Sequence, residues 1–149
     1  TFKFDSIDLF LFCVENTCEN FDVTGITLDG NNKSSGCAGL FINTGILYSI
    51  NITATNCTVI NCLATPNGEG GAIFNAGTLT LNNCTLINNS LEQGFPYDDE
   101  TGGAIYNKGT LTLNNTTITG NTAEIAGGVY TTKPIVIQGT TIIKNNKSN

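Results

Sequence analysis

The sequence lacks histidine, arginine, tryptophan and methionine, and charged residues make up only 12% of its 149 positions. Without histidine and arginine, the chain lacks the commonest general base and the side chain best suited to grip phosphate or carboxylate groups. With a net charge of −6, the protein offers no basic surface for nucleic acid. No window carries an apolar stripe at the helical period, which argues against helical repeats.

What the sequence does have is a repeat. The segment GGAIFNAGTLTLNN (residues 70–83) returns as GGAIYNKGTLTLNN (residues 102–115). Degenerate copies lie on both sides: INITATNCTVINC precedes the first, NFDVTGITLDGNN lies further upstream, and AGGVYTTKPIVIQGTTIIKNN follows the second. Self-similarity of this kind predicts at least five structural repeats that bury their apolar faces against one another.

Each copy contains an aliphatic residue followed three positions later by asparagine. The pairs are Leu28/Asn31, Leu86/Asn89, Ile118/Asn121 and Ile142/Asn145, with Val59/Cys62 as a degenerate copy. Just upstream, alternating apolar residues such as Leu79/Leu81 and Leu111/Leu113 predict half-buried strands. The intervals between copies vary, as expected for stacked coils with loops inserted at one corner. We predict an all-β fold: a parallel β-helix (solenoid) of about five to six coils, each with two or three short strands.

The repeats predict a single β-helix domain over residues 1–149. Residues 21–146 carry the repeats, and residues 90–101 form an inserted loop. Residues 1–20 form an N-terminal strand or a possible first coil, in which Phe2/Phe4 would match Phe21/Val23. Asparagine at the corners is expected to adopt the left-handed conformation, and the Gly-Gly pairs to form tight bends.

The N-terminal stretch is apolar, and neither end shows an amphipathic helix that would cap a solenoid. The run IDLFLF (residues 7–12) is too short to cross a membrane, so no membrane insertion is expected. An apolar strand beside an open solenoid end predicts that the protein binds itself end to end as a homopolymer. The same residues could instead fold back as an intramolecular first coil. The residues concerned are Phe2, Phe4, Ile7, Leu9 and Leu11.

Six cysteines in a chain of this length are typical of a secreted protein. Cys57 and Cys84 occupy the same repeat position, for which Ile26, Thr116 and Thr140 are the predicted equivalents. Stacked on neighbouring coils, the two cysteines would lie within disulfide reach. Cys13 could then pair with Cys18, and Cys37 with Cys62; alternatively, the thiols are buried as small apolar groups. Without histidine or a Cys-x-x-Cys spacing, neither a metal–thiolate site nor a cofactor is expected.

The combination of GGAI with an aliphatic-x-x-Asn motif resembles the GGAI and FxxN repeats of chlamydial polymorphic outer membrane proteins. It is also similar to adhesin-like β-helix proteins of microbial surfaces. The resemblance covers residues 21–146, although the aromatic residue of FxxN is Leu, Val or Ile in this chain. It implies a right-handed parallel β-helix, exposed on a cell surface, with an adhesive or structural role.

Enzymes also use the right-handed β-helix, so a polysaccharide-active lyase or hydrolase is the alternative function. The only dense acidic cluster is Asp98, Asp99 and Glu100, which we interpret as part of a solvated loop and secondarily as a weak calcium candidate. Ice binding is a minor alternative, suggested by the pairs Thr78/Thr80 and Thr110/Thr112. The pattern does not extend to the equivalent positions of the other coils.

Eight Asn-x-Ser/Thr sequons are candidate glycosylation sites. They begin at Asn32, Asn51, Asn56, Asn83, Asn88, Asn114, Asn115 and Asn146. Corner asparagines are expected to be inaccessible in a tight stack, which leaves Asn32 and Asn51 as the favoured acceptors.

Together these features predict a non-catalytic extracellular or cell-surface solenoid, either a stalk or adhesin segment or the subunit of a self-assembling fibre. Its expected partners are further copies of itself, or cell-surface carbohydrate or protein.

Overall fold

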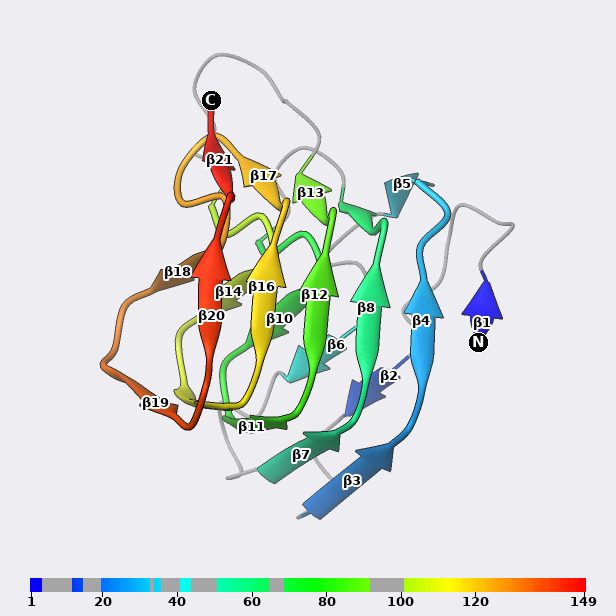
Figure 1. Ribbon diagram of the computed structural model, residues 1–149, viewed down its shortest axis with the longest axis vertical. Helices are drawn as coiled ribbons and strands as arrows, with labels where there is room; N and C mark the ends of the chain where they lie inside the picture. Colours follow the sequence, from blue (N-terminus) through cyan, green and yellow to red (C-terminus); the bar gives the residue numbers. More distant parts are fainter. Residues whose placement is uncertain are drawn as a thin grey trace.

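The computed structural model folds the chain into a stack of short parallel strands (Figure 1). It describes residues 1–3, 12–14, 20–32, 34–35, 41–43, 51–64, 69–91 and 101–149. These segments contain strands, turns and bends but no helix. The predicted all-β solenoid is therefore confirmed, while its right-handed coiling stays a prediction.

Four parallel sheets form the walls of the solenoid. Sheet A contains β1 (Phe2–Lys3), β4 (Thr27–Asp29), β8 (Thr58–Ile60), β12 (Thr85–Ile87), β16 (Thr117–Thr119) and β20 (Ile142–Lys144). Sheet B contains β2 (Phe12–Val14), β6 (Phe41–Asn43), β10 (Ile73–Asn75), β14 (Ile105–Asn107) and β18 (Val129–Thr131). Sheet C contains β3 (Asn20–Thr24), β7 (Asn51–Thr55), β11 (Thr78–Asn82), β15 (Thr110–Asn114) and β19 (Ile135–Gln138). Sheet D contains β5 (Ser34–Ser35), β9 (Leu63–Ala64), β13 (Ser90–Leu91), β17 (Thr122–Ala123) and β21 (Lys147–Ser148).

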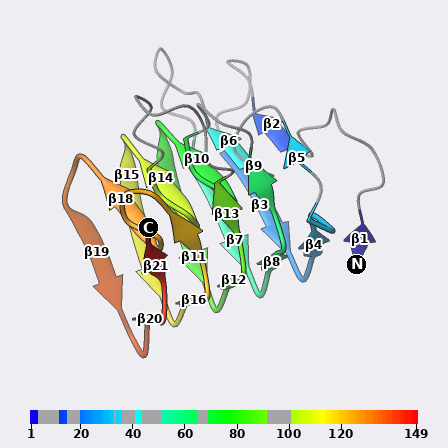
Figure 2. The ribbon, with the colours of Figure 1, turned by 90° about the horizontal axis from the view of Figure 1, so that it is seen from above.

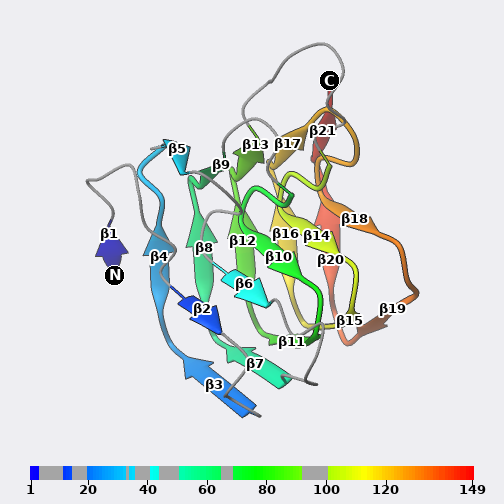
Figure 3. The ribbon, with the colours of Figure 1, turned by 180° about the vertical axis from the view of Figure 1, so that it is seen from behind.

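The chain visits the sheets in the order B, C, A and D before it starts the next coil, which we call a rung. A rung therefore has four strands, not the predicted two or three. The strands of sheet D were missed because two residues are too few to show an alternating pattern. Seen from above in Figure 2 and from behind in Figure 3, the rungs lie one after another, with the two termini at opposite ends of the stack.

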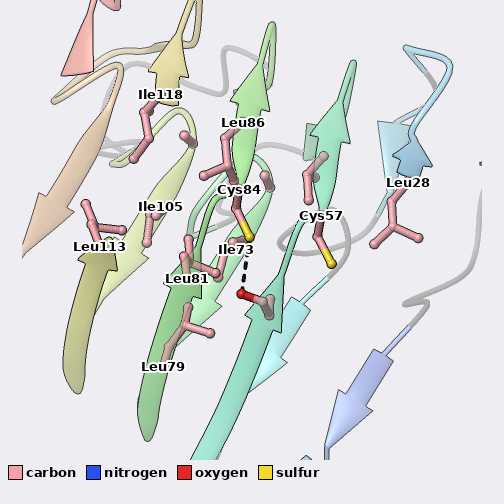
Figure 4. Close-up of a cluster of buried hydrophobic side chains, with 14 of the residues drawn as sticks. Leu28, Cys57, Ile73, Leu79, Leu81, Cys84, Leu86, Ile105, Leu113 and Ile118 are labelled. Atoms are coloured by element: carbon pink, nitrogen blue, oxygen red, sulfur yellow. Dashed lines mark hydrogen bonds between the residues drawn. The ribbon is translucent and has the colours of Figure 1, made fainter. Parts of the chain in front are cut away.

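The core consists of inward side chains that stack in register from rung to rung. Leu79 pairs with Leu111 and Leu81 with Leu113 between β11 and β15, while Leu86 pairs with Ile118 between β12 and β16. All six of these side chains are at most 3% exposed. Figure 4 shows those of Leu79, Leu81, Leu86, Leu113 and Ile118 pointing into the interior. The apolar alternation in the repeats thus predicted both the buried face and its register.

The predicted alignment of the last rung is wrong by one residue from Thr140 onward. Ile118 pairs with Ile143, not Ile142, so Asn146 rather than Asn145 is the equivalent of Asn121. The cause is the corner between sheets C and A. Residues 139–141 separate the paired strands β19 and β20, whereas only residues 115–116 separate β15 and β16. Thr141, not Thr140, is therefore the equivalent of Thr116.

The N-terminal alignment also needs correction. Phe2 pairs with Leu28 in sheet A, so it does not match Phe21, which lies in sheet C. Strand β2 pairs with β6, and the first rung thus begins at Phe12, upstream of the predicted start at residue 21. The short strand β1 folds back onto β4 of its own chain, which for Phe2–Lys3 is the intramolecular arrangement left open by the sequence.

The corners follow the predicted chemistry. Asparagines occupy the left-handed region at both corners that flank sheet A, with φ between 52° and 55° at Asn56, Asn61, Asn83 and Asn88. Gly70 has φ 82°, and a Cβ there would overlap the carbonyl group of Ile73, so its bend requires glycine.

Both ends of the predicted loop at residues 90–101 belong to the stack instead. Ser90 and Leu91 form β13, and Leu91 packs with Ala64 and Ala123 in a small cluster beside the main core. Thr101 bridges to Glu69 and Ile125 on the neighbouring rungs. Residues 92–100, which include Asp98, Asp99 and Glu100, lie outside the described residues.

Candidate interaction surfaces

Three aromatic rings form a ladder on the outer face of sheet B. Phe74, Tyr106 and Tyr130 occupy matching positions of β10, β14 and β18. The ring centroids of Phe74 and Tyr106 are 5.8 Å apart, and those of Tyr106 and Tyr130 are 5.1 Å apart, with interplanar angles of 8° and 12°. Because the rings stack on one another, most of their faces are already occupied, and the ladder chiefly stabilises the sheet.

An ion pair lies beside this ladder. The Lys108 Nζ atom is 2.7 Å from Glu69 Oε1, and it lies 4.8 Å from the ring centroid of Tyr106 and 5.5 Å from that of Phe74. Both charged side chains are exposed, by 43% for Lys108 and 40% for Glu69. We call Glu69, Phe74, Tyr106, Lys108 and Tyr130 the aromatic–ion-pair cluster. The sequence predicted none of it, although the change from Ala76 to Lys108 between the two repeats was a signal.

The electrostatics of this cluster favour fixed charges over proton transfer. Burial raises the pKa of Tyr106, so its hydroxyl stays neutral. The hydrogen bond to Glu69 raises the pKa of Lys108, so its amine stays protonated. Lys108 therefore keeps a positive charge beside the rings of Phe74 and Tyr106, and the Tyr106 hydroxyl adds no charge.

Threonines line the outer faces of sheets C and A. On sheet C, Thr53, Thr80 and Thr112 are in register on three rungs, whereas Thr78 and Thr110 match on two. The column of Thr53 ends at Asp22 on one side and at Val136 on the other, as the sequence predicted. A longer column went unnoticed: Thr27, Thr58, Thr85 and Thr117 stack on four rungs of sheet A. Its signal was a threonine two residues after each asparagine at the corner between sheets C and A, namely Asn56, Asn83 and Asn115.

Buried asparagines connect the rungs from inside. Asn75 donates to Asn107 Oδ1 over 2.6 Å, and Asn89 donates to Asn121 Oδ1 over 3.0 Å. Asn121 in turn donates to Asn146 Oδ1 over 2.8 Å. The aliphatic-x-x-Asn motif pointed to the second ladder, whereas the ladder through Asn75 and Asn107 was missed. Its asparagines are the final residues of GGAIFN and GGAIYN.

The C-terminal rung leaves part of the core open. Ile137 is 54% and Ile143 is 41% exposed, although their partners Leu113 and Ile118 on the rung below are fully buried. The apolar open end observed in the structure is thus C-terminal. Of the N-terminal assembly candidates, Phe2 lies in β1, while Phe4, Ile7, Leu9 and Leu11 lie outside the described residues.

The predicted Cys57–Cys84 disulfide is not formed, because Cys57, Cys62 and Cys84 are free, buried thiols. Strands in register hold the two Cβ vectors side by side at the rung spacing of about 4.8 Å, wider than the Cβ separation that a disulfide requires. The Cys84 thiol instead donates to the Ala54 carbonyl oxygen over 3.3 Å (Figure 4). The backbone of Cys13 lies in β2, and Cys18 and Cys37 lie outside the described residues.

The expectation that corner asparagines would be inaccessible is wrong. The side chains of Asn56, Asn83, Asn88 and Asn115 are exposed, as are those of Asn32 and Asn51, whereas Asn114 and Asn146 are half-buried. A left-handed corner lies at the outer edge of a rung, where the stack covers the neighbouring strands but not the turn itself.

Within the described part of the chain, no three side chains of histidine, cysteine, aspartate or glutamate lie close enough to hold a metal ion. The described segments also include no helix long and apolar enough to cross a membrane.

No family model, no curated protein and no solved structure matches this chain. The resemblance to the polymorphic outer membrane proteins and to adhesin-like β-helix proteins therefore rests on the repeat motifs alone.

Proposed function

We propose that this chain is a non-catalytic, extracellular β-solenoid that serves as a stalk or adhesive segment on a cell surface. The observation that carries the proposal is the register of the stack. Core side chains, buried asparagines and aromatic rings all continue from rung to rung at matching positions. A solenoid of this kind holds its length and presents regular outer faces along its sides.

The charge distribution supports contact between ends. Residues 125–149 contain three lysines and no acidic residue, whereas the described residues 20–29 of the first rung contain Asp22 and Asp29 and no lysine. Opposite charges on two ends favour a head-to-tail approach.

The arrangement of the strands at the two ends of the stack nevertheless favours a stalk over a homopolymer. Among the described strands, sheet A begins with β1, one strand ahead of the sheets that begin with β2, β3 and β5. If β1 of a second copy paired with β20, its β2 and β3 would stand two rungs away from β18 and β19, with no described strand between them. The described strands of the second copy would then leave Ile137 uncovered. We therefore infer a monomeric segment whose sides make the adhesive contacts.

The hydroxyl columns of sheets A and C support cell-surface carbohydrate or protein as the adhesive partner. Threonine hydroxyls repeated at the rung spacing of about 4.8 Å give many weak contacts to an extended polymer. Ice binding, the minor alternative, is less well supported because the threonine pairs of sheet C are complete on two rungs only.

A polysaccharide lyase or hydrolase remains the alternative, and the aromatic–ion-pair cluster is the place to test it. Among the described residues the cluster offers one carboxylate, from Glu69, whereas glycoside hydrolysis typically needs two. The protonated state of Lys108 also disfavours a base at this position. Turnover of acidic polysaccharides by the wild-type chain, lost in Lys108→Met, would establish the enzyme and refute our proposal.

The proposal is tested on the cells that produce the protein. Antibodies raised against the folded chain should label intact cells, and external protease should remove that signal. Labelling that requires permeabilised cells would refute the surface location. Light scattering should show a monomer, whereas growth of the particles with concentration would restore the fibre model.

A further inference from the structure

Three of the eight sequons lie at the same corner on consecutive rungs. Asn56, Asn83 and Asn115 occupy the turn between sheets C and A, with φ of 53°, 52° and 49°. Strand pairing before and after the turn places them in register, and all three side chains are exposed. They form a straight column along one edge of the solenoid, which we call the corner column.

Each sequon of the corner column follows the same path. The middle residue turns into the core, where Cys57, Cys84 and Thr116 are buried. The hydroxyl residue then returns to the outer face of sheet A, as Thr58, Thr85 and Thr117. A substituent on the asparagine would therefore point away from the packed interior.

The side-chain amides separate these sequons from most of the others. Nδ2 of Asn51 donates to Asn20 Oδ1 over 3.2 Å, and Nδ2 of Asn114 donates to Asn82 Oδ1 over 3.2 Å. Nδ2 of Asn146 donates to the Ile118 carbonyl oxygen over 3.0 Å. Within the described residues, the side chains of Asn56 and Asn83 make no hydrogen bond. Asn115 uses only its Oδ1, which accepts from the backbone N–H of Thr140 over 2.9 Å. A substituent on these three Nδ2 atoms would thus replace no bond between rungs.

We propose that the corner column is the attachment edge for asparagine-linked glycans, and that glycans occupy alternate rungs only. The inference rests on the proposed extracellular location. The donor would be an oligosaccharide linked to a polyprenyl phosphate. A bond forms between Nδ2 and the anomeric carbon of the sugar, while the bond from that carbon to the phosphate oxygen breaks. The lipid phosphate leaves, and the transferase takes up the proton lost from the amide.

The alternation follows from the spacing of the rungs. Neighbouring strands lie about 4.8 Å apart, which is narrower than a pyranose ring with its hydroxyl groups. Glycans on Asn56 and Asn83 would therefore collide near their attachment points. Asn56 and Asn115 are two rungs apart, about 9.6 Å by the same spacing, and can both be occupied. A single molecule should thus carry a glycan on Asn83 alone, or on one or both of the outer two sites.

The test uses the full chain, secreted from a host that glycosylates asparagine, with the folded fraction selected by protease resistance. Mass spectrometry of glycopeptides gives the occupancy of each site, and intact mass gives the number of glycans per molecule. We expect the corner column to be occupied several-fold more than Asn51, Asn114 and Asn146. We also expect no molecule with glycans on two neighbouring rungs.

Matched variants sharpen the result. Thr85→Val removes the acceptor sequon while it keeps Asn83, and should raise the fraction with both Asn56 and Asn115 occupied. Thr85→Ser keeps the sequon and should preserve the wild-type pattern. Thr80→Val changes a similar half-buried threonine outside any sequon, and should leave every occupancy unchanged.

A folded, secreted chain with no glycan on the corner column would overturn the inference. So would preferential occupancy of Asn51, Asn114 or Asn146, or molecules modified at both Asn56 and Asn83. None of these results bears on the surface location, which the labelling of intact cells tests separately.

Discussion

The substitution Leu79→Ala tests whether the stack is held together by its core columns. Leu79 is 1% exposed and lies between Ile52 and Leu111, which are 1% and 0% exposed on the neighbouring rungs. Removal of a buried leucine side chain usually lowers the free energy of unfolding by about 2 to 5 kcal/mol, depending on how far the site can collapse. Here five-residue ladders on both sides of β11 hold the rungs at a fixed spacing. We therefore expect a loss in the upper half of this range, about 3 to 5 kcal/mol.

Ile137→Ala is the matched control, because it truncates an inward aliphatic residue of the same sheet at the open end. With Ile137 54% exposed, we expect a loss of about 1 kcal/mol or less. Urea unfolding followed by far-ultraviolet circular dichroism measures both values, and tyrosine fluorescence checks that the rungs unfold together. Equal losses for the two variants would show that the columns are not the main source of stability.

Three further predictions concern the polar and ionisable groups. Asn121→Ala should lower the free energy of unfolding by about 1 to 3 kcal/mol for each buried group left unpaired, among them the Asn89 backbone N–H; urea unfolding near the wild-type midpoint would contradict this. Burial raises the pKa of Cys84 to about 11 and that of Cys62 to about 12, from an ordinary value of 9.0. The unfolded chain therefore loses these protons first, and stability should fall as the pH rises from about 9 toward 12. A smaller fall in stability in Cys62→Ala would give the contribution of Cys62. Stability that does not change between pH 9 and 12 in the wild-type chain would refute the prediction. Lys108→Met should change stability by no more than about 1 kcal/mol, because the ion pair with Glu69 is exposed; a larger loss in thermal or urea unfolding would show that Lys108 anchors the aromatic ladder.

The geometry that disfavours the predicted disulfide is the same one that builds the ladders. Rungs in register bring equivalent residues to the same position but keep their side chains parallel. Parallel side chains favour ladders, such as Asn89 with Asn121 or Tyr106 with Tyr130. They disfavour bonds that require two groups to turn toward each other, as Cys57 and Cys84 would have to do.

The repeat alone determined the architecture, because one coil cannot bury its apolar face and every copy must present the same face to the next. This is why the positions of Leu79, Leu81 and Leu86, and their partners on the next rung, could be read from local alternation. The left-handed asparagine corners were also predictable, since few other residues tolerate a positive φ.

Features that depend on the contacts between rungs could be established only from the tertiary structure. One extra residue at the corner before β20 moved Ile143 and Asn146 into positions that local similarity had assigned to Ile142 and Asn145. The pairing of β1 with β4, the open rung at Ile137 and the aromatic–ion-pair cluster likewise depend on residues far apart in sequence. Local alternation shows which side chains point into the core. Which residues then meet on neighbouring rungs depends on the length of every turn that lies between them in the sequence.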